Sequence, residues 1–381
     1  MSEPQPIYLD YNATTPLAPE VTEAIAPCLG PLFGNPSSPH RYGIAARRAV
    51  ERARDQVAAF LGCASGEVVF TSNGTESNNM AIKGMAGAYS KRQHIITTAI
   101  EHPATLEPCA YLAERGYEIT VLPVDATGLV DPEDVARVMR DDTLLVSVMH
   151  ANNEVGTVQP IAEIAEVAHA RGALVHTDAA QSAGKLDVQV ERLGVDLLSL
   201  AGHKLYAPKG VGALYIREGV RLSKTMHGAG HEGNRRASTE NLIGIVGFGA
   251  ACELAADGLA THAAHMGAMR DRLQAGLVAG AGDTRVNGHP SQRLPNTLSI
   301  GFRGLDAEDL LVALFDTVAA SAGAACHSNE VTVSAVLRAM GVPFEYARGT
   351  LRFSVGRMTT EDEIDRAIGH VCDAVREVRG E

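Results

Sequence analysis

Short apolar runs alternate with segments of helical spacing from about residue 66 to residue 250 of this 381-residue chain. Runs rich in branched apolar residues and bounded by turn residues are typical of strands that are buried on both faces. Such runs lie at residues 94–99, 117–124, 144–149, 195–200 and 211–216. Residues 160–171 have the apolar spacing of a helix instead. The alternation predicts an α/β fold in which helices cover a mainly parallel sheet.

The pattern changes near residue 260 to that of a smaller α+β unit. We expect a helix near 261–280, strands at 296–302 and 350–356, and a last helix that begins after a capping box formed by Thr360 and Glu363.

One lysine, Lys204, lies just past the strand predicted at 195–200, within the glycine-bracketed sequence SLAGHKLYAPKGVG. A free ammonium between two buried strands is costly unless it is paired or consumed in a Schiff base. A lone loop lysine is usually solvated, so its interpretation depends on which other groups the fold brings to the same place.

Two further features converge on this edge of the sheet. Asp178 ends the apolar run ALVHTD (173–178), at the carboxyl edge where open α/β sheets bind ligands. The segment EVVFTSNGT (67–75) predicts a strand, a glycine turn and the start of a helix, whose first amides favour an anion. A lysine, a carboxylate for the pyridine nitrogen and a phosphate cradle are the three requirements of a pyridoxal phosphate (PLP) site.

Ten ordered motifs resemble those of the NifS-type (group I) cysteine desulfurases and the related selenocysteine lyases, which are fold-type I PLP enzymes. They are YLDYNATTP (8–16), FGNPSSPH (33–40), TSNGTESNN (71–79), Glu101-His102, MHANNEVGTVQPI (149–161), HTDAAQSAGK (176–185), AGHKLYAPKGVGALY (201–215), HGAGHEGNRRASTEN (227–241), SAGAACHS (321–328) and LRFSVGRMTTEDEID (351–365). The resemblance implies a fold-type I transferase fold. Residues 16–259 would form a large PLP-binding domain with a mainly parallel seven-stranded sheet, and residues 1–15 with 260–381 a small α+β domain that carries a catalytic cysteine loop.

The resemblance also implies a role for each cofactor residue. Lys204 would bind PLP covalently and remove the substrate α-proton, Asp178 would keep the pyridine nitrogen protonated, and His102 would stack on the ring. The remaining contacts would be made by Asn153 beside ring and substrate, Gln181 at the phenolic oxygen, Gly74, Thr75 and His203 at the phosphate, and Thr239 from the second subunit of a homodimer. Taken one at a time, these histidines and amides would sooner be interpreted as ordinary structural residues, and the motif context reverses that order.

Cys326 would be the catalytic thiol. It lies in a loop of small residues from which a thiolate could attack the substrate sulfur and later pass it on. His327 could lower its pKa or simply be solvated. Arg352 would bind the substrate carboxylate in a bidentate manner, although the neighbouring Arg348 and Arg357 leave open that it forms a surface ion pair.

The implied reaction converts L-cysteine to L-alanine and leaves a persulfide on Cys326, for iron–sulfur cluster or other thio-cofactor synthesis through a sulfur-acceptor protein of unknown identity. A selenocysteine lyase that releases selenide and L-alanine is the main alternative. An aminotransferase of the same fold would not need the thiol, and a non-catalytic sulfur-carrier subunit would be expected to have lost Lys204 or Asp178.

Composition excludes several other classes of function. The formal net charge of −12 argues against nucleic-acid binding. The first ten residues lack the basic and apolar regions of a secretory signal. The apolar stretch LIGIVGFGAAC (242–252) is too short to span a bilayer. The six cysteines form no CxxC pair or metal-ligand cluster. We therefore expect a cytoplasmic protein with reduced thiols and without metal, nucleic acid or membrane as a partner.

Three positions depart from the family pattern. Ala201 stands where many cysteine desulfurases have a serine on the phosphate, and Ser238 stands where they have a glycine. The chain ends at Glu381, directly after the last predicted helix, without the extension through which some relatives dock an iron–sulfur scaffold. Docking of such a scaffold is accordingly in doubt.

Overall fold

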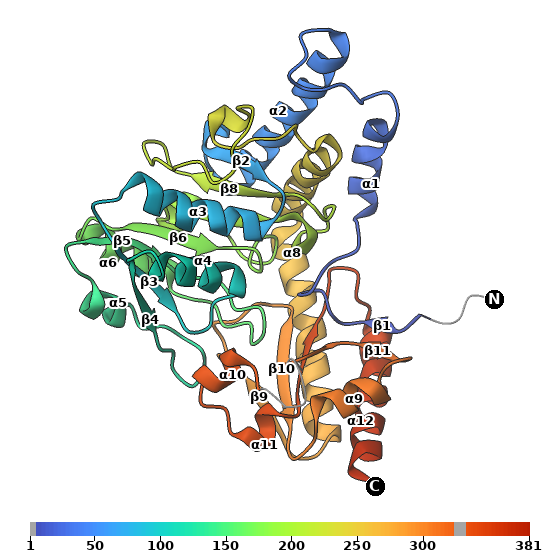
Figure 1. Cartoon of the computed structure of the whole chain (residues 1–381). Helices are drawn as coiled ribbons and strands as arrows, with labels where there is room; N and C mark the ends of the chain where they lie inside the picture. The colour runs from blue at the N-terminus through green and yellow to red at the C-terminus, as the bar shows by residue number, and fades with distance from the viewer. Residues whose placement is uncertain (1–4, 324–332) are drawn as a thin grey trace.

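A computed structural model describes residues 5–323 and 333–381 of the chain (Figure 1). Its larger part is built on a seven-stranded sheet with the strand order β2-β8-β7-β6-β5-β3-β4. The strands are β2 (Val68–Thr71), β3 (His94–Thr98), β4 (Glu118–Leu122), β5 (Thr143–Ser147), β6 (Leu174–Asp178), β7 (Leu197–Ala201) and β8 (Gly212–Ile216). Only β8 runs antiparallel to its neighbours, β7 and β2. The predicted α/β fold with a mainly parallel seven-stranded sheet is confirmed.

Alternate residues of each strand pack into different cores on the two faces of this sheet. Val69 of β2 contributes to one core with α3 (Gly74–Ala88) and α4 (Pro103–Ala113). Val68 and Phe70 contribute to the other. That second core is covered by α2 (Arg41–Leu61), α5 (Pro132–Val138), α6 (Ile161–Ala170), α7 (Val190–Leu193) and the first part of α8 (Leu242–Gly280). Because helices cover both faces of the sheet, a ligand can reach it only at the ends of its strands.

The helix α8 runs through both parts of the molecule (Figure 1). Its residues up to Ala255 pack against the sheet, and those from Met266 onward pack in a second core. The sequence indicated a helix only near 261–280, because Gly244, Gly247 and Gly249 lower the helix propensity of the first part. The structure explains one of these glycines, since a Cβ at Gly249 would lie 2.7 Å from the Cα of Ala53 on α2.

Within the described ranges, α8 is the one helix that is long and apolar enough to cross a membrane. The apolar stretch at 242–252, which alone is too short to do so, is thus the beginning of a longer helix. Its buried side chains, among them Phe248 and Leu273, pack in the two cores of the molecule. This packing is typical of a core helix.

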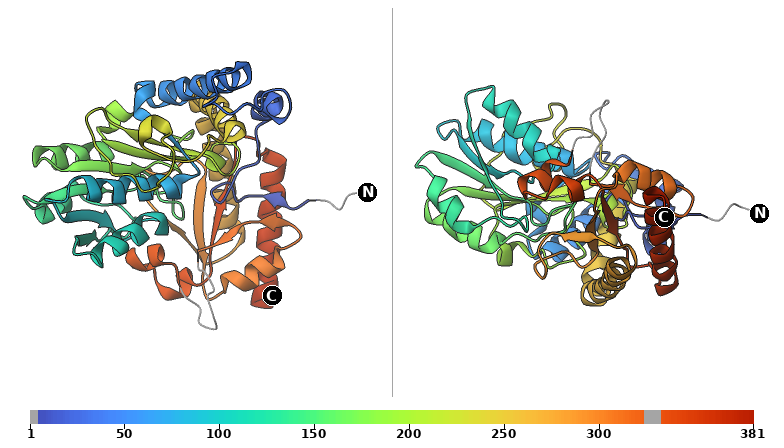
Figure 2. Two further views of the ribbon diagram at one scale, coloured as in Figure 1. Left: turned by 45° about the horizontal axis from the view of Figure 1, so that its top comes forward. Right: turned by 90° about the horizontal axis from the view of Figure 1, so that it is seen from below.

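The second part of the molecule is an antiparallel sheet with the order β12-β13-β10-β9, packed on the end of α8 and on α12 (Figure 2). Its elements are β9 (Thr284–Asn287), β10 (Thr297–Phe302), α9 (Ala307–Ala313), β11 (Val318–Ala319), β12 (Ser321–Ala322), α10 (Ala335–Ala339), α11 (Phe344–Ala347), β13 (Thr350–Ser354) and α12 (Glu361–Arg379). The capping box predicted at Thr360 and Glu363 begins α12.

The N-terminal segment joins this second part before α1 (Pro19–Ile25) leads into the large part. Strand β1 (Ile7–Tyr8) pairs in parallel with β11, and Asp10 forms a bridge with Ser354. The side chains of Ile7 and Leu9 are buried in the same core as β10 and β13. The segment then passes between the two parts of the molecule, where its residues 12 and 13 line a pocket.

Candidate active site

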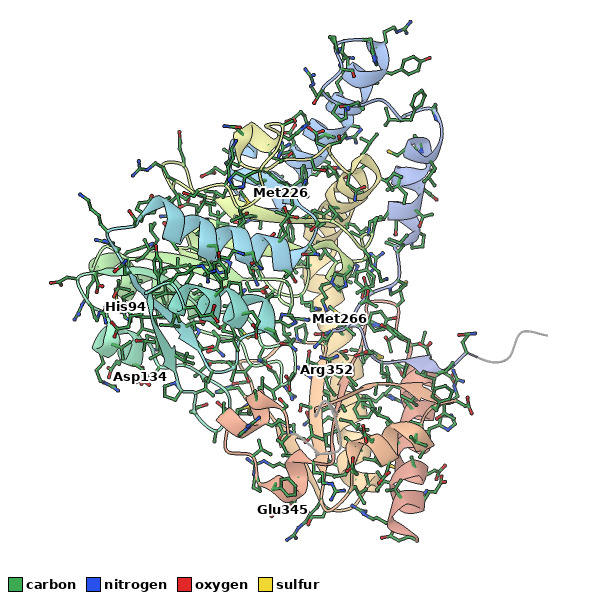
Figure 3. All side chains as sticks on the ribbon, in the orientation of Figure 1. His94, Asp134, Met226, Met266, Glu345 and Arg352 are labelled. Atoms are coloured by element: carbon green, nitrogen blue, oxygen red, sulfur yellow. The ribbon has the colours of Figure 1, made fainter. Side chains whose placement is uncertain are left out.

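A pocket of about 370 Å³ lies at the carboxyl ends of β2, β6 and β7. Most of the predicted site residues line it, namely Gly74, Thr75, His102, Asn153, Asp178, Gln181, His203, Lys204 and Arg352. Figure 3 shows Arg352 near the centre of the molecule, between its two parts. Residues drawn from a wide range of the sequence therefore meet in one hollow.

Lys204 follows β7 after a short turn. Its Nζ donates to the backbone carbonyls of Asn12 (2.5 Å) and Ala13 (2.7 Å). Burial, and to a lesser degree the charge of Arg352, lowers the pKa of Lys204 to about 8, while two nearby carboxylates oppose this shift. The neutral, nucleophilic form of this amine is therefore far more populated near neutral pH than in a lysine of ordinary pKa.

Asp178 is the last residue of β6. Its Oδ2 accepts a hydrogen bond from Asn78 Nδ2 (2.7 Å), and its Oδ1 accepts one from the amide of Ala180 (2.9 Å). Asn78 lies on α3, so the carboxylate is fixed from two elements.

The turn between β2 and α3 forms a cradle for an anion. Asn73 caps α3 by accepting from the amide of Glu76 (2.8 Å), and Gly74 and Thr75 occupy its first turn. A Cβ at Gly74 would lie 3.3 Å from the Cβ of Ala201, so the cradle is tight at this point. Ala201 also lines the pocket, and it offers a methyl group where a serine would offer a hydroxyl donor.

The two predicted histidines that line the pocket are neutral groups. His102 caps α4, and its Nδ1 accepts from the amide of Ala104 (3.0 Å), which leaves the proton on Nε2. Burial lowers the pKa of His102, and it lowers the pKa of His203 to about 4. His203 Nδ1 lies 3.3 Å from Thr14 Oγ1.

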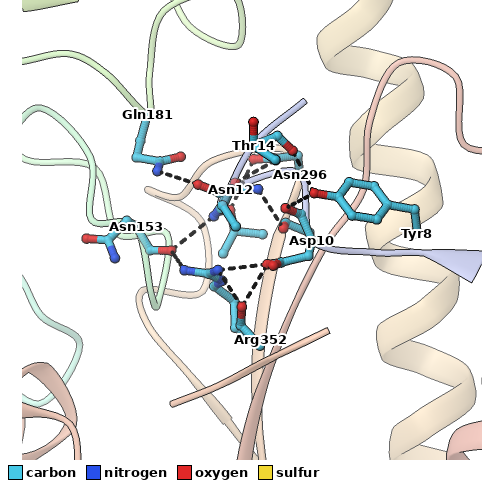
Figure 4. A network of polar contacts seen from close by, with 12 residues as sticks. Tyr8, Asp10, Asn12, Thr14, Asn153, Gln181, Asn296 and Arg352 are labelled. Atoms are coloured by element: carbon cyan, nitrogen blue, oxygen red, sulfur yellow. Dashed lines mark hydrogen bonds and ion pairs between the residues drawn. The ribbon is translucent and has the colours of Figure 1, made fainter. Parts of the chain in front are cut away.

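The opposite wall of the pocket is a network of polar side chains (Figure 4). Arg352 on β13 donates through Nη2 to Asp10 Oδ1 (2.8 Å) and Ser321 Oγ (2.9 Å), and through Nη1 to the carbonyl of Asn153 (3.1 Å). The side-chain exposures of Arg352 and Asp10 are only 11% and 17%. The surface ion pair considered for Arg352 from sequence is therefore wrong, because its partner is largely enclosed.

Asn12 is the centre of this network, and sequence reasoning did not give it a role. Its Nδ2 donates to Thr297 Oγ1 (2.8 Å), and its Oδ1 accepts from Asn296 Nδ2 (2.9 Å). Its backbone carbonyl accepts from both Lys204 and Gln181 Nε2 (3.0 Å). The motif YLDYNATTP was the signal that could have directed attention to Asn12 and Asp10.

The structure does not bring every predicted residue into this pocket. Thr239 is not among the described residues that line it, but lies exposed on the loop 227–241. Cys326 and His327 lie outside the described residues. Ser321 precedes them, and Ser334 follows them and donates to Glu154 Oε2 (2.5 Å).

The donor set of the pocket fits PLP. An amine of lowered pKa, a fixed carboxylate and the first turn of a fifteen-residue helix line one wall, as the three requirements of the cofactor demand. The buried Oε1 of Gln181 has no partner in residues 5–323 and 333–381, so this side chain has bonding capacity left for a ligand. Over the same residues no group of three His, Cys, Asp or Glu side chains could hold a metal ion.

Comparison with known proteins gives consistent results. Residues 7–367 match the family model described as aminotransferase class-V. The chain is 48% identical over 361 residues to the cysteine desulfurase IscS of Dictyoglomus turgidum, covering 94% of this chain and 92% of that protein. It is 46% identical to the protein of the same name from Methanosarcina thermophila, covering 99% of this chain and 94% of that one.

Solved structures agree with these relatives. One described as a NifS-like protein superposes with a TM-score of 0.92 at 37% identity, covering 98% of this chain and 100% of that one. Another, SspA in complex with cysteine, superposes with a TM-score of 0.81 at 35% identity, covering 93% and 99%.

Proposed function

Because the chain belongs to the class-V aminotransferase family and, within it, to the cysteine desulfurases, we propose that its pocket binds PLP and L-cysteine. The products would be L-alanine and a persulfide on Cys326. The observation that carries the proposal is the meeting of Lys204, Asp178 and Arg352 in one pocket.

The wall of the pocket that contains Gly74, Asp178 and Lys204 would hold the cofactor. Gly74 and Thr75 would offer backbone amides to its phosphate, Asp178 would pair with its ring nitrogen, and His102 would stack on its ring. When bound, PLP supplies a site for covalent attachment of the substrate amine and draws electron density from the substrate α-carbon. Lys204 Nζ, with its lowered pKa, removes the α-proton in its neutral form.

The opposite wall would orient the substrate. Arg352 binds the α-carboxylate, and Asn153 lies beside it. The thiolate of Cys326 then attacks the substrate sulfur: the S–S bond forms, the Cβ–S bond breaks, and its electron pair stays with the substrate carbon. Cβ takes up one proton, Cα regains the proton that Lys204 removed, and the product leaves as L-alanine. The assignment of this role to Cys326 comes from the motif SAGAACHS.

We also propose a homodimer in which Thr239 completes the phosphate site of the other subunit. The loop 227–241 is anchored by two Arg–Glu pairs, Arg54 with Glu232 (2.6 Å) and Arg236 with Glu76 (2.6 Å), which leave Thr239 presented outward. Arg54 lies on α2, and large apolar side chains are exposed near the start of that helix. They are Leu29 (71% exposed), Phe33 (69%) and Tyr42 (58%). Exposed apolar groups gathered in this way favour a protein interface.

The cellular role that we propose is sulfur supply in the cytoplasm for iron–sulfur clusters or other thio-cofactors, through a separate acceptor protein. Four of the five cysteines in the described ranges are buried: Cys28, Cys109, Cys252 and Cys372. Their burial raises the pKa of each of these thiols. They are thus poorly suited to carry sulfur.

The test is to measure L-alanine and persulfide formed from L-cysteine by the purified, PLP-loaded protein, beside a Cys326→Ala variant and with L-selenocysteine as a second substrate. We expect both products from L-cysteine, and their loss in the variant while L-alanine binding is kept. Cysteine turnover that is undiminished in the variant would remove Cys326 from the reaction. A preference for L-selenocysteine by several orders of magnitude would identify the protein as a lyase instead.

A further inference from the structure

The guanidinium of Arg352 already has a carboxylate partner from within the chain. Nη2 contacts both Asp10 Oδ1 (2.8 Å) and Ser321 Oγ (2.9 Å), and Ser321 Oγ donates in turn to the same Asp10 oxygen (2.9 Å). The three groups form a closed triangle. Figure 4 shows Asp10 and Arg352 pointing toward one another.

The remaining donors of Arg352 do not form a pair that could bind a carboxylate. A guanidinium binds a carboxylate through two parallel N–H groups, either Nε with Nη2 or Nη1 with Nη2. Both pairs include Nη2, the atom that Asp10 and Ser321 already engage. Nε is buried and has no partner in the described part of the chain, and Nη1 donates to the carbonyl of Asn153. A bidentate substrate therefore meets a guanidinium whose shared nitrogen is taken.

We propose that Asp10 is an internal competitor of the substrate carboxylate, which must displace it from Arg352 Nη2 in order to bind. The inference rests on the proposed function, because it assumes that Arg352 receives an amino-acid carboxylate. Asp10 is then a specificity-determining residue, since a ligand without a carboxylate cannot make this exchange. Only the difference between the two carboxylate contacts contributes to substrate affinity, so the substrate is held less tightly than a free arginine would hold it.

The partly enclosed position of the pair makes this competition effective. The exposures of 11% and 17% for Arg352 and Asp10 contrast with 45% and 52% for the surface pair of Arg272 and Asp365. Exposed pairs contribute little because water and salt screen them, whereas a shielded contact must be replaced by an equivalent one. A carboxylate ligand supplies that replacement, and an uncharged group does not.

The experiment compares binding of two amines to the PLP-loaded enzyme, measured as the change in cofactor absorbance at equilibrium. L-Alanine carries the carboxylate and has no sulfur to react, and ethylamine lacks the carboxylate. In the Asp10→Asn variant we expect L-alanine to bind about tenfold more tightly, as for one charge-assisted contact, and ethylamine to bind unchanged. Ser321→Ala is a second variant, for which we expect a smaller gain with L-alanine only.

The matched control is Glu20→Gln. Glu20 is the carboxylate partner of Arg357 (3.2 Å), whose side chain is also largely enclosed, but Arg357 does not line the pocket. This variant should leave the binding of both amines unchanged.

Two outcomes would overturn the proposal. Unchanged or weaker L-alanine binding in Asp10→Asn would mean that Asp10 only holds Arg352 in place. Equal tightening for both amines would mean that Asp10 acts through the nearby Lys204. Failure of the proposed function looks different, because the wild-type enzyme itself would then show no preference for L-alanine over ethylamine.

Discussion

The cofactor wall and the substrate wall of the pocket are assembled in different ways: the first from strand ends of one sheet, the second from contacts between residues far apart in the sequence. On the cofactor wall, Gly74, Asp178 and Lys204 each lie at or just past the carboxyl end of a strand in the same sheet. On the substrate wall, Arg352 bonds to residues 199 and 342 positions away in the chain. Sheet topology alone brings the first group together, whereas the second group meets only after the N-terminal segment has packed between the two parts of the molecule. The chemistry and the selectivity of the site therefore have separate structural origins.

The largest expected effect concerns the cofactor wall. Replacing Lys204 by alanine removes both the attachment point and the base, so turnover should fall by about 10⁴-fold, the upper range for a lost general base. The absorbance of the bound cofactor and the rate of L-alanine formation, measured on the same sample, would test this prediction. Lys209, exposed in the same loop, gives the control, and a Lys209→Ala variant that lost as much activity would contradict the assignment.

A smaller loss is expected for Asp178→Asn. The charged hydrogen bond to the ring nitrogen would disappear, and such a bond contributes about 1.5–3 kcal/mol, so kcat should fall by about 10- to 150-fold. Cofactor affinity, measured by dialysis, should fall as well. Unchanged cofactor affinity would show that the carboxylate does not face the ring.

Arg352→Lys changes only the substrate wall. Lysine cannot form the bidentate contact, so KM for L-cysteine should rise by about tenfold or more while cofactor affinity stays unchanged. Steady-state kinetics and PLP titration on the same sample test the separation of the two walls. A parallel loss of cofactor would contradict it.

The pH dependence of cofactor attachment is a finer test. The reactive form of Lys204 is the neutral amine, and its pKa is lowered to about 8. The rate at which the cofactor-free protein takes up PLP should therefore rise with pH up to about 8 and level off above it. A rate that continues to rise toward pH 10 would indicate a lysine of ordinary pKa.

The smallest effect concerns the loop that is proposed to reach the partner site. Ser238 has a φ of +85°, a conformation that favours glycine. Ser238→Gly should stabilise the protein by about 0.5–1 kcal/mol, measured by urea unfolding at fixed protomer concentration. Ser37, exposed and without positive φ, serves as the control, because Ser37→Gly should destabilise slightly.

The difference between the walls also explains what could be predicted from sequence. Asp178 and Lys204 were found because each ends or follows an apolar run, and parallel strands bring such ends to one edge. Arg352 was named through its motif, but its partners Asp10 and Ser321 were not, because no local pattern encodes a contact across 342 residues. The start of α8 was missed for a related reason: the packing against α2 that makes its glycines favourable is a tertiary property.

The continuous helix α8 has a consequence for engineering. At 1.5 Å per residue, its 39 residues form a rod of about 58 Å that belongs to both cores. A swing of one part against the other would have to bend or break this rod. Attempts to widen the substrate range should accordingly redesign individual side chains around Arg352, since loosening a hinge would sacrifice the stability of both halves at once.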